Sequence, residues 1–491
     1  MASAPSDELA FRSAVELASM LRRKELSSRA LLEHFLARIE KANPRLNAVV
    51  TLDVERALAA ADAADGVLAR GGSLGALHGL PITIKDSFET EGLRTTCGAP
   101  LLADHVPTAD ADAVARLRGA GAIVFGKTNT PLLAGDVQTY NDLFGRTTNP
   151  WDPARTPGGS SGGAAAAVAA GLTSFELGSD IGGSIRTPAS WCGVYGHKPS
   201  HGIVPVRGHI PPAPGALATQ DLAVAGPIAR SPADLELALD LLAGPDAARG
   251  VAWRLVLPPA RARALRDFRV AAWLDDPAFP VDGAVGARLE ATVDALSSAG
   301  VRVAREARPG FSLAELQETY LRLLTPVIAS GFPAVVFDRL VALAEAAPPG
   351  APVDDALRTA RDGTARHRDW IAANERREQL RARLAAFFRE FDVLLLPVAP
   401  VAAIPFDESA PITSRRIHVS GVARSYYELF GWIGLASATL HPATVAPVGR
   451  TAEGLPVGLQ IVGPWLEDRT PLRFAQLLAG VIGGYEAPPH S

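Results

Sequence analysis

The chain has 491 residues, of which 48% are hydrophobic and 20% charged, and its 48 basic and 52 acidic side chains leave a formal net charge of −4. This balance excludes the strongly basic surface with which proteins bind nucleic acids or anionic lipids, so we expect a small-molecule partner and no nucleic acid. The length exceeds the size at which single hydrophobic cores stop growing, which predicts one large sheet or two to three domains.

Neither export nor membrane insertion is expected. No stretch of about 20 residues is apolar and free of charged residues, glycine and proline, as a membrane span requires. The N-terminus alternates acidic, apolar and basic residues and lacks the apolar core of a signal peptide. The two cysteines, Cys97 and Cys192, can pair only once, which does not make a disulfide framework. These features predict a cytoplasmic protein.

The first 70 residues are predicted to form helices. Apolar residues recur at helical spacing over 14–23, and again from an N-cap at Ser27 or Ser28 to a stop at Pro44. A third helix begins near residue 54 and ends at Gly71 and Gly72.

The middle of the chain alternates strands and helices. A short buried strand at 82–84 precedes a helix over 110–121 and a strand over 122–129. After an irregular segment, the pattern continues with a glycine loop and short helix at 157–170, a strand within 174–180, a helix over 231–245, and a strand, helix and strand between 268 and 306.

The last part is helical from about 305 to 390, returns to strands at 391–400 and 455–464, and ends in a helix. Alternating helices and strands are typical of a sheet covered by helices. We therefore expect an α/β fold with a large mixed β-sheet covered on both faces by helices. We expect it to form a single domain over residues 1–491 with a helical elaboration at about 250–390.

The segment TPGGSSGGAAAAVAAG, at 156–171, is open to three interpretations. It lacks the GK[ST] ending of a phosphate-binding loop. Gly159, Ser161 and Gly163 match the G-x-S-x-G nucleophile motif, but no strand precedes them as that motif requires. A glycine-rich turn before a helix remains the simplest interpretation of this segment alone.

A second glycine loop, SDIGGSIRTP, contains Ser184. The run Ile181, Gly182, Gly183, Ser184 offers consecutive backbone N–H groups, as an oxyanion hole requires. A nucleophilic serine needs a base, and no histidine lies in either loop. Lys85 follows a predicted strand and is one of only five lysines among the 48 basic residues. Unlike arginine, a buried lysine can lose its proton and act as a base.

Together, PITIKD, GGSSGG with its alanine-rich helix, and SDIGGSIRTPASWCGVYGHKPS resemble the amidase signature family. This family of Ser-Ser-Lys amide hydrolases includes fatty acid amide hydrolase and amidotransferase A-type subunits. The resemblance extends over most of the chain and is weakest between about 250 and 380. It implies the amidase signature fold, with a signature core at about 75–230.

The resemblance also implies a catalytic triad. Its nucleophile falls on Ser184, its base on Lys85, and its bridging serine on Ser160, which in the family follows a cis peptide bond. The backbone of Ile181, Gly182, Gly183 and Ser184 becomes the oxyanion hole. Ser161 is expected to support Lys85. Arg186 is expected either to order the oxyanion loop or to form an ordinary ion pair.

The implied reaction is hydrolysis of a carboxylic amide by water through an acyl-enzyme, with esters and carbamates as further candidates. No metal or organic cofactor is implied, and the ligand spacings of a zinc site are absent. A homodimer is left open.

Three functions remain to be separated. The first is a stand-alone hydrolase of apolar or aryl amides, the second a glutamine-dependent amidotransferase A-type subunit, and the third an inactive binding protein. An apolar lining would favour the first, although the four residues that could form it could equally belong to the core: Phe430, Trp432, Ile433 and Leu435.

Overall fold

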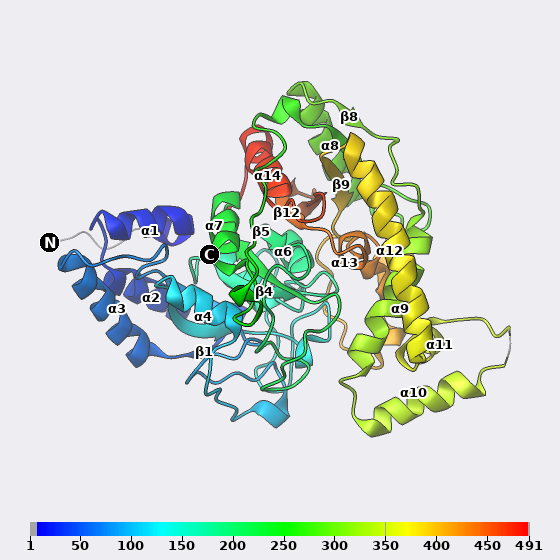
Figure 1. Ribbon diagram of the computed structural model, residues 1–491, viewed down its shortest axis with the longest axis horizontal. Coiled ribbons are helices and arrows are strands. Elements are labelled where there is room, and N and C mark those ends of the chain that lie inside the picture. The colour runs from blue at the N-terminus through cyan, green and yellow to red at the C-terminus, as the bar shows by residue number, and fades with distance from the viewer. Residues whose placement is uncertain (1–6, 349, 490–491) are drawn as a thin grey trace.

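The computed structural model describes residues 7–348 and 350–489 (Figure 1). Its centre is an 11-stranded mixed sheet with the strand order β1-β3-β2-β4-β6-β5-β12-β13-β9-β7-β8. The strands of this sheet are β1 Val49–Leu52, β2 Pro81–Lys85, β3 Ile123–Thr128, β4 Glu176–Asp180, β5 Tyr195–Lys198, β6 Val224–Ala229, β7 Val270–Ala272, β8 Val303–Ala304, β9 Val393–Pro397, β12 Ala443–Arg450 and β13 Pro456–Val462. A separate hairpin pairs β10 (Arg416–Val419) with β11 (Val422–Ser425).

Helices flank this sheet, which confirms the predicted fold class. They are α1 Ala14–Arg22, α2 Ser28–Leu46, α3 Val54–Ala69, α4 Asp112–Gly119, α5 Gly162–Ala169, α6 Arg186–Cys192, α7 Pro232–Leu242, α8 Gly283–Ser298, α9 Leu313–Ala329, α10 Ala334–Ala346, α11 Asp355–Gly363, α12 His367–Glu390, α13 Gly434–Ala438 and α14 Arg469–Ile482. No helix within the described residues is long and apolar enough to cross a membrane.

The predicted stop of the second helix at Pro44 is wrong, because α2 continues through it to Leu46. The fixed φ of proline is compatible with a helix, and near a C-terminus few backbone bonds depend on it. The helix ends instead at Asn47, which takes the left-handed conformation at φ 51°. The side chain of Asn43 then accepts hydrogen bonds from the amides of Ala48 and Val49, at 2.8 and 2.9 Å, which turns the chain into β1.

The sheet brings two chemically important strand ends together. Strand β2 runs parallel to β4, with Thr83 opposite Glu176 and Ile84 opposite Leu177. Because parallel strands end at the same edge of a sheet, Lys85 at the end of β2 lies near Asp180 at the end of β4.

Helices α5 and α6 pack on the sheet where the strands carry glycine. A Cβ atom at Gly178 of β4 would lie 3.0 Å from Ser161 Oγ, and one at Gly458 of β13 would lie 2.8 Å from Ser190 Cβ. Every residue of α5 and α6 is buried. The small residues of the two helices therefore bring their backbones close to the sheet.

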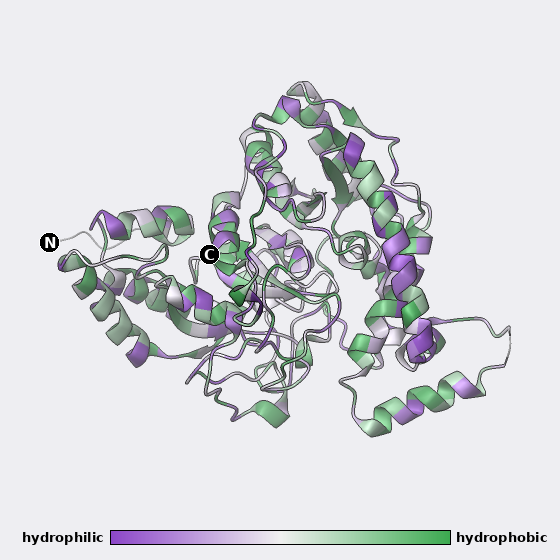
Figure 2. Cartoon of the chain, in the orientation of Figure 1, coloured by the Kyte–Doolittle hydropathy of each residue, from purple (hydrophilic) through white to green (hydrophobic). Residues whose placement is uncertain are grey.

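Helices α9 to α12 lie at the opposite end of the molecule from α1 to α3 (Figure 1). Helix α10 lies at the edge of the molecule and is mostly hydrophobic in Figure 2. None of its residues is buried, and its Val335 and Leu343 side chains are 58% and 43% exposed.

Candidate active site

Lys85 is fully buried at the carboxyl end of β2 and bonds two serines. Its Nζ lies at hydrogen-bond distance from Ser160 Oγ, at 2.7 Å, and from Ser179 Oγ, at 2.9 Å. Burial lowers the pKa of Lys85 from 10.5 to about 7, and the nearby carboxyl groups of Asp180 and Glu176 only partly offset this effect. A large fraction of Lys85 is therefore neutral near pH 7.

Ser160 reaches Lys85 from the glycine loop at 156–163, where the Gly159–Ser160 peptide bond is cis, as the family resemblance predicts. The loop is tightly packed, because a Cβ atom at Gly159 would lie 2.7 Å from the carbonyl oxygen of Asp136. Asp136 is itself held by Arg415 at 2.6 Å and by the hydroxyl of Tyr426 at 2.7 Å.

Ser161 connects the two glycine loops, and its hydrogen bonds go to the backbone and not to Lys85. Its amide donates to the carbonyl of Ser184 at 3.1 Å, and its hydroxyl donates to the carbonyl of Ser179 at 3.3 Å. Its side chain makes no N-cap bond to α5. Ser161 therefore fixes the backbone on both sides of the turn that carries Ser184.

Ser184 lies in the turn between β4 and α6 and is 8% exposed. The carboxylate of Asp180 organises this turn, accepting from the amide of Gly183 at 3.0 Å and from that of Ile185 at 3.1 Å. The N–H of Gly183 is thus engaged. Gly183 has a φ of +88°, a conformation that favours glycine.

Arg186 forms an ion pair with Asp180, and this ion pair is what orders the oxyanion loop. The two roles expected for Arg186, loop ordering and ion pairing, are therefore one interaction. The guanidinium contacts the carboxylate at 2.8 and 3.0 Å, and both side chains are fully buried. Burial alone would raise the pKa of Asp180, but Arg186 lowers it to about 2. The remaining donors of Arg186 bond three groups from the C-terminal part of the chain: the carbonyl of Ile433 at 2.7 Å, Gln460 Oε1 at 2.6 Å and Ser437 Oγ at 2.7 Å.

Of the four candidate lining residues, Phe430 is partly exposed, whereas Trp432, Ile433 and Leu435 are fully buried. Phe430 and Ile433 face the glycine run, since Cβ atoms at Gly182 and Gly183 would lie 3.1 Å from their respective side chains. Trp432 is fully buried in the core, where its Nε1 donates to the carbonyl of Phe279 at 3.1 Å, and Leu435 is also fully buried. Tyr320, which sequence reasoning missed, donates its hydroxyl to the carbonyl of Ile181 at 2.6 Å.

Sequence reasoning also missed Ser179 and His209. Ser179 opens the quoted motif SDIGGSIRTP, so a signal was present in its position before the glycine run. His209 lies in the loop after β5, and no local pattern connects it with Lys85. Nevertheless, its Nε2 lies 2.9 Å from Ser179 Oγ.

No cluster of metal-ligating side chains is found among residues 7–348 and 350–489. Cys97 and Cys192 are both buried and unpaired with one another. Burial raises the pKa of the Cys97 thiol to about 12 and raises that of Cys192 as well.

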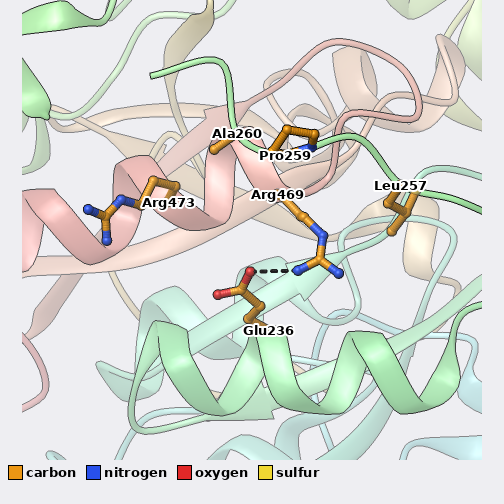
Figure 3. Close-up of a pocket in the computed structure, with 6 residues that line it drawn as sticks. All are labelled: Glu236, Leu257, Pro259, Ala260, Arg469 and Arg473. Carbon is orange, nitrogen blue, oxygen red and sulfur yellow. Dashed lines mark hydrogen bonds and ion pairs between the residues drawn. The ribbon is translucent and has the colours of Figure 1, made fainter. Parts of the chain in front are cut away.

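A cavity of about 380 Å³ lies between α7, α14 and the segment at 257–260 (Figure 3). An ion pair of 2.9 Å between Glu236 and Arg469 crosses it. None of the predicted site residues lines this cavity, so it is separate from the cluster around Lys85.

Comparison with known proteins gives a family match over residues 30–472, to the family described as Amidase. The A-type subunit of glutamyl-tRNA(Gln) amidotransferase from Thermus thermophilus is 36% identical, over 94% of this chain and 95% of that protein. Further relatives with that name are 32–34% identical. Indoleacetamide hydrolase of Bradyrhizobium diazoefficiens is 33% identical, over 93% of this chain and 84% of that protein.

Solved structures agree with the sequence relatives. A bacterial aryl acylamidase of the amidase signature enzymes superimposes with a TM-score of 0.79 at 26% identity, over 96% of each chain.

Proposed function

This chain belongs to the amidase signature family, and from that membership we propose that it cleaves a carboxylic amide through an acyl-enzyme on Ser184. It is an enzyme of a family that acts on amide C–N bonds. The observation that carries the assignment of residues is the 2.7 Å hydrogen bond between the buried amine of Lys85 and Ser160.

In the proposed mechanism, neutral Lys85 is the base and Ser160 relays the proton. As Ser184 Oγ attacks the acyl carbon, its proton passes to Ser160 and the proton of Ser160 passes to Lys85. The same relay returns a proton to the leaving nitrogen, so the amine or ammonia departs neutral. Water then attacks the acyl ester along the same path and releases the acid.

The negative charge that develops on the carbonyl oxygen needs backbone donors. Because the N–H of Gly183 already bonds Asp180, we assign the oxyanion hole chiefly to the amides of Ile181, Gly182 and Ser184. The ion pair between Asp180 and Arg186 holds this run in place before substrate binds.

For the physiological amide, the sequence relatives favour glutamine over an aryl amide. The A-type subunits of glutamyl-tRNA(Gln) amidotransferases match nearly the whole chain. We therefore propose, as the first candidate, a glutamine-dependent amidotransferase component that releases ammonia from the side-chain amide of glutamine for a partner protein.

A stand-alone hydrolase of apolar or aryl amides is the second candidate, and a specific observation favours it. The side chains nearest Gly182 and Gly183 are those of Phe430, Tyr320, Thr187 and Ile433, and none of them offers a charge to the amino and carboxylate groups of free glutamine. The relative named indoleacetamide hydrolase supports the same candidate.

Ser184→Ala should abolish amide turnover, because no other group forms the acyl ester. The protein should stay folded, as judged by an unchanged circular dichroism spectrum and melting temperature. Turnover at the wild-type rate would remove Ser184 from the mechanism.

The substrate is identified by incubating the wild-type protein with glutamine, indoleacetamide, an anilide and an ester, then weighing the trapped acyl-enzyme. A glutamyl adduct with ammonia release, dominant over the other substrates, supports the first candidate. An aryl or alkyl acyl adduct, formed faster than any glutamyl adduct, supports the second.

A further inference from the structure

His209 lies behind Lys85 and is connected to it by hydrogen bonds through Ser179. Lys85 Nζ is 2.9 Å from Ser179 Oγ, which is in turn 2.9 Å from His209 Nε2. On the other side of the imidazole, Nδ1 is 3.2 Å from the carbonyl oxygen of Pro211. These contacts form one chain of hydrogen bonds that ends on the base proposed above.

The chemistry of its members gives this chain a direction. A carbonyl oxygen can only accept, so Nδ1 of His209 carries the proton that bonds Pro211. Burial and the charge of Lys85 lower the pKa of His209 to about 3, which keeps the ring neutral. In a neutral ring with Nδ1 protonated, Nε2 is an acceptor, and the Ser179 hydroxyl donates to it.

Donation from Ser179 to His209 determines which hydrogen bond Lys85 can make with Ser179. The hydroxyl of Ser179 has one proton, which His209 holds, so toward Lys85 its oxygen can only accept. A neutral amine has two N–H donors and one lone pair. With an N–H directed at Ser179, the lone pair is free for the proton of Ser160. If Nε2 were absent, the Ser179 proton could turn to the lone pair of Lys85 and compete with Ser160.

The position of His209 is well fixed. Its backbone forms an isolated antiparallel bridge with Phe88, and the two rings meet edge to face with centroids 4.9 Å apart. The next amide, that of Ile210, donates to the carbonyl of Ser87 at 2.7 Å. The loop after β5 is therefore attached to the segment that directly follows Lys85.

We propose that His209 is a positioning residue for the base: by accepting the proton of Ser179, it keeps the lone pair of Lys85 directed at Ser160. The inference rests on the proposed role of Lys85 and adds to it a group from a loop outside the glycine motifs. His209 does not exchange protons with the substrate in this scheme.

The protonation of the ring tests the inference without any assay of activity. In protein labelled with ¹⁵N-histidine, the signals that disappear in His209→Gln belong to His209. We expect an Nδ1–H tautomer at pH 7.5, with an unprotonated Nε2 whose shift changes in Ser179→Ala. A ring protonated at Nε2 would overturn the proposal.

Kinetics test the contact between His209 and Ser179 through two substitutions of His209, one that removes the hydrogen-bond acceptor and one that keeps it. His209→Phe removes the acceptor and should lower kcat by about 10-fold or more with KM nearly unchanged, because only the proton transfer is impaired. His209→Gln places an amide oxygen near the position of Nε2 and should restore kcat to within about 3-fold of wild type. Equal losses in the two variants would overturn the proposal.

A double-mutant cycle separates positioning from packing. In a Ser179→Ala background no hydroxyl proton can compete for Lys85, so His209→Phe should cost less than about 2-fold there. A loss as large as that in the wild-type background would overturn the proposal. The matched control is His78→Phe, because His78 is also half-buried and bonds one carbonyl, but lies before the start of β2.

The failure of this inference can be told apart from failure of the proposed function. Full activity in Ser184→Ala refutes the acyl-enzyme. An inactive Ser184→Ala together with an additive cycle refutes only the positioning role of His209.

Discussion

Lys85 can act as a base only while its amine is neutral, and burial is what makes it neutral near pH 7. The same burial makes the residue irreplaceable by arginine, which keeps its proton at every accessible pH. The same buried position therefore gives Lys85 both its low pKa and its hydrogen bonds to two serines.

The activity should accordingly depend on pH with a single acidic limb. Protonated Lys85 has no lone pair, so kcat/KM should fall about 10-fold per pH unit below a pKa of about 7 and level off above it. Lys85→Arg should have no measurable activity at any pH. The measurement is kcat/KM between about pH 5 and 9 on an amide that does not itself titrate; a profile that stays flat through pH 6 would contradict the proposed base.

The sequence singled out Lys85, Ser160 and Ser184 because each lies in a distinctive glycine-rich or strand-end motif, and the structure joins Lys85 to Ser160 by a hydrogen bond. It did not predict His209, because the contact with Ser179 depends on how the loop after β5 packs against Phe88. The apolar run near 430 is ambiguous for a related reason: Trp432 and Ile433 are both fully buried in the core, and only a contact distant in sequence places Ile433 against Gly183.

Among the elements, α5 shows most clearly why the glycine-rich segment at 156–171 needs its glycines. Gly163 lies in the first turn of this helix, where a Cβ atom would be 2.4 Å from the amide nitrogen of Asn129. That nitrogen belongs to the backbone just after β3 and cannot move without distorting the sheet. The helix, the strand and the Ser160 turn are packed against one another.

Gly163→Ala should lower the free energy of unfolding by about 1–3 kcal/mol, since the new methyl group overlaps backbone atoms. The matched control is Gly286→Ala in α8, where no atom lies within 4 Å of the added Cβ. Because alanine is the better helix former, the control should raise the free energy of unfolding by about 0.5–1 kcal/mol. Urea denaturation of both variants tests the prediction, and effects of the same sign would contradict it.

Element prediction failed where pairing is long-range. The sequence does not predict strand β5, because YGHK has too few apolar residues for a strand pattern, yet the strand pairs with both β6 and β12. Strand β12 lies far later in the chain, and such a partner is not visible in local periodicity. By contrast β2, β3, β9 and β13 carry apolar runs that identify them directly.

At the scale of the whole molecule, the main core extends from the N-terminal helices to α14, beside a smaller second cluster around Trp191, and both cysteines are buried. Their burial raises both thiol pKa values, so neither is a thiolate at neutral pH. The rate at which the two thiols react therefore measures unfolding that exposes them to solvent.

In native buffer at pH 8, neither Cys97 nor Cys192 should react with a thiol reagent on the timescale of minutes. In denaturing urea two thiols per chain should react at once. The colour released by an aromatic disulfide reagent measures both. Immediate reaction of the native protein would contradict the packing, and fewer than two thiols after denaturation under non-reducing conditions would contradict the absence of a disulfide between them.

The bonds of Arg186 join parts of the chain that the ribosome synthesises at different times. Lys85, Ser160 and Ser184 leave the ribosome early, but the guanidinium that holds the turn of Ser184 depends on Ile433, Ser437 and Gln460. Until those residues are synthesised, Arg186 has only Asp180 among these partners, and β5 lacks its neighbour β12. A nascent chain therefore contains all three residues of the proposed triad before it contains the contacts that hold the turn of Ser184 in place.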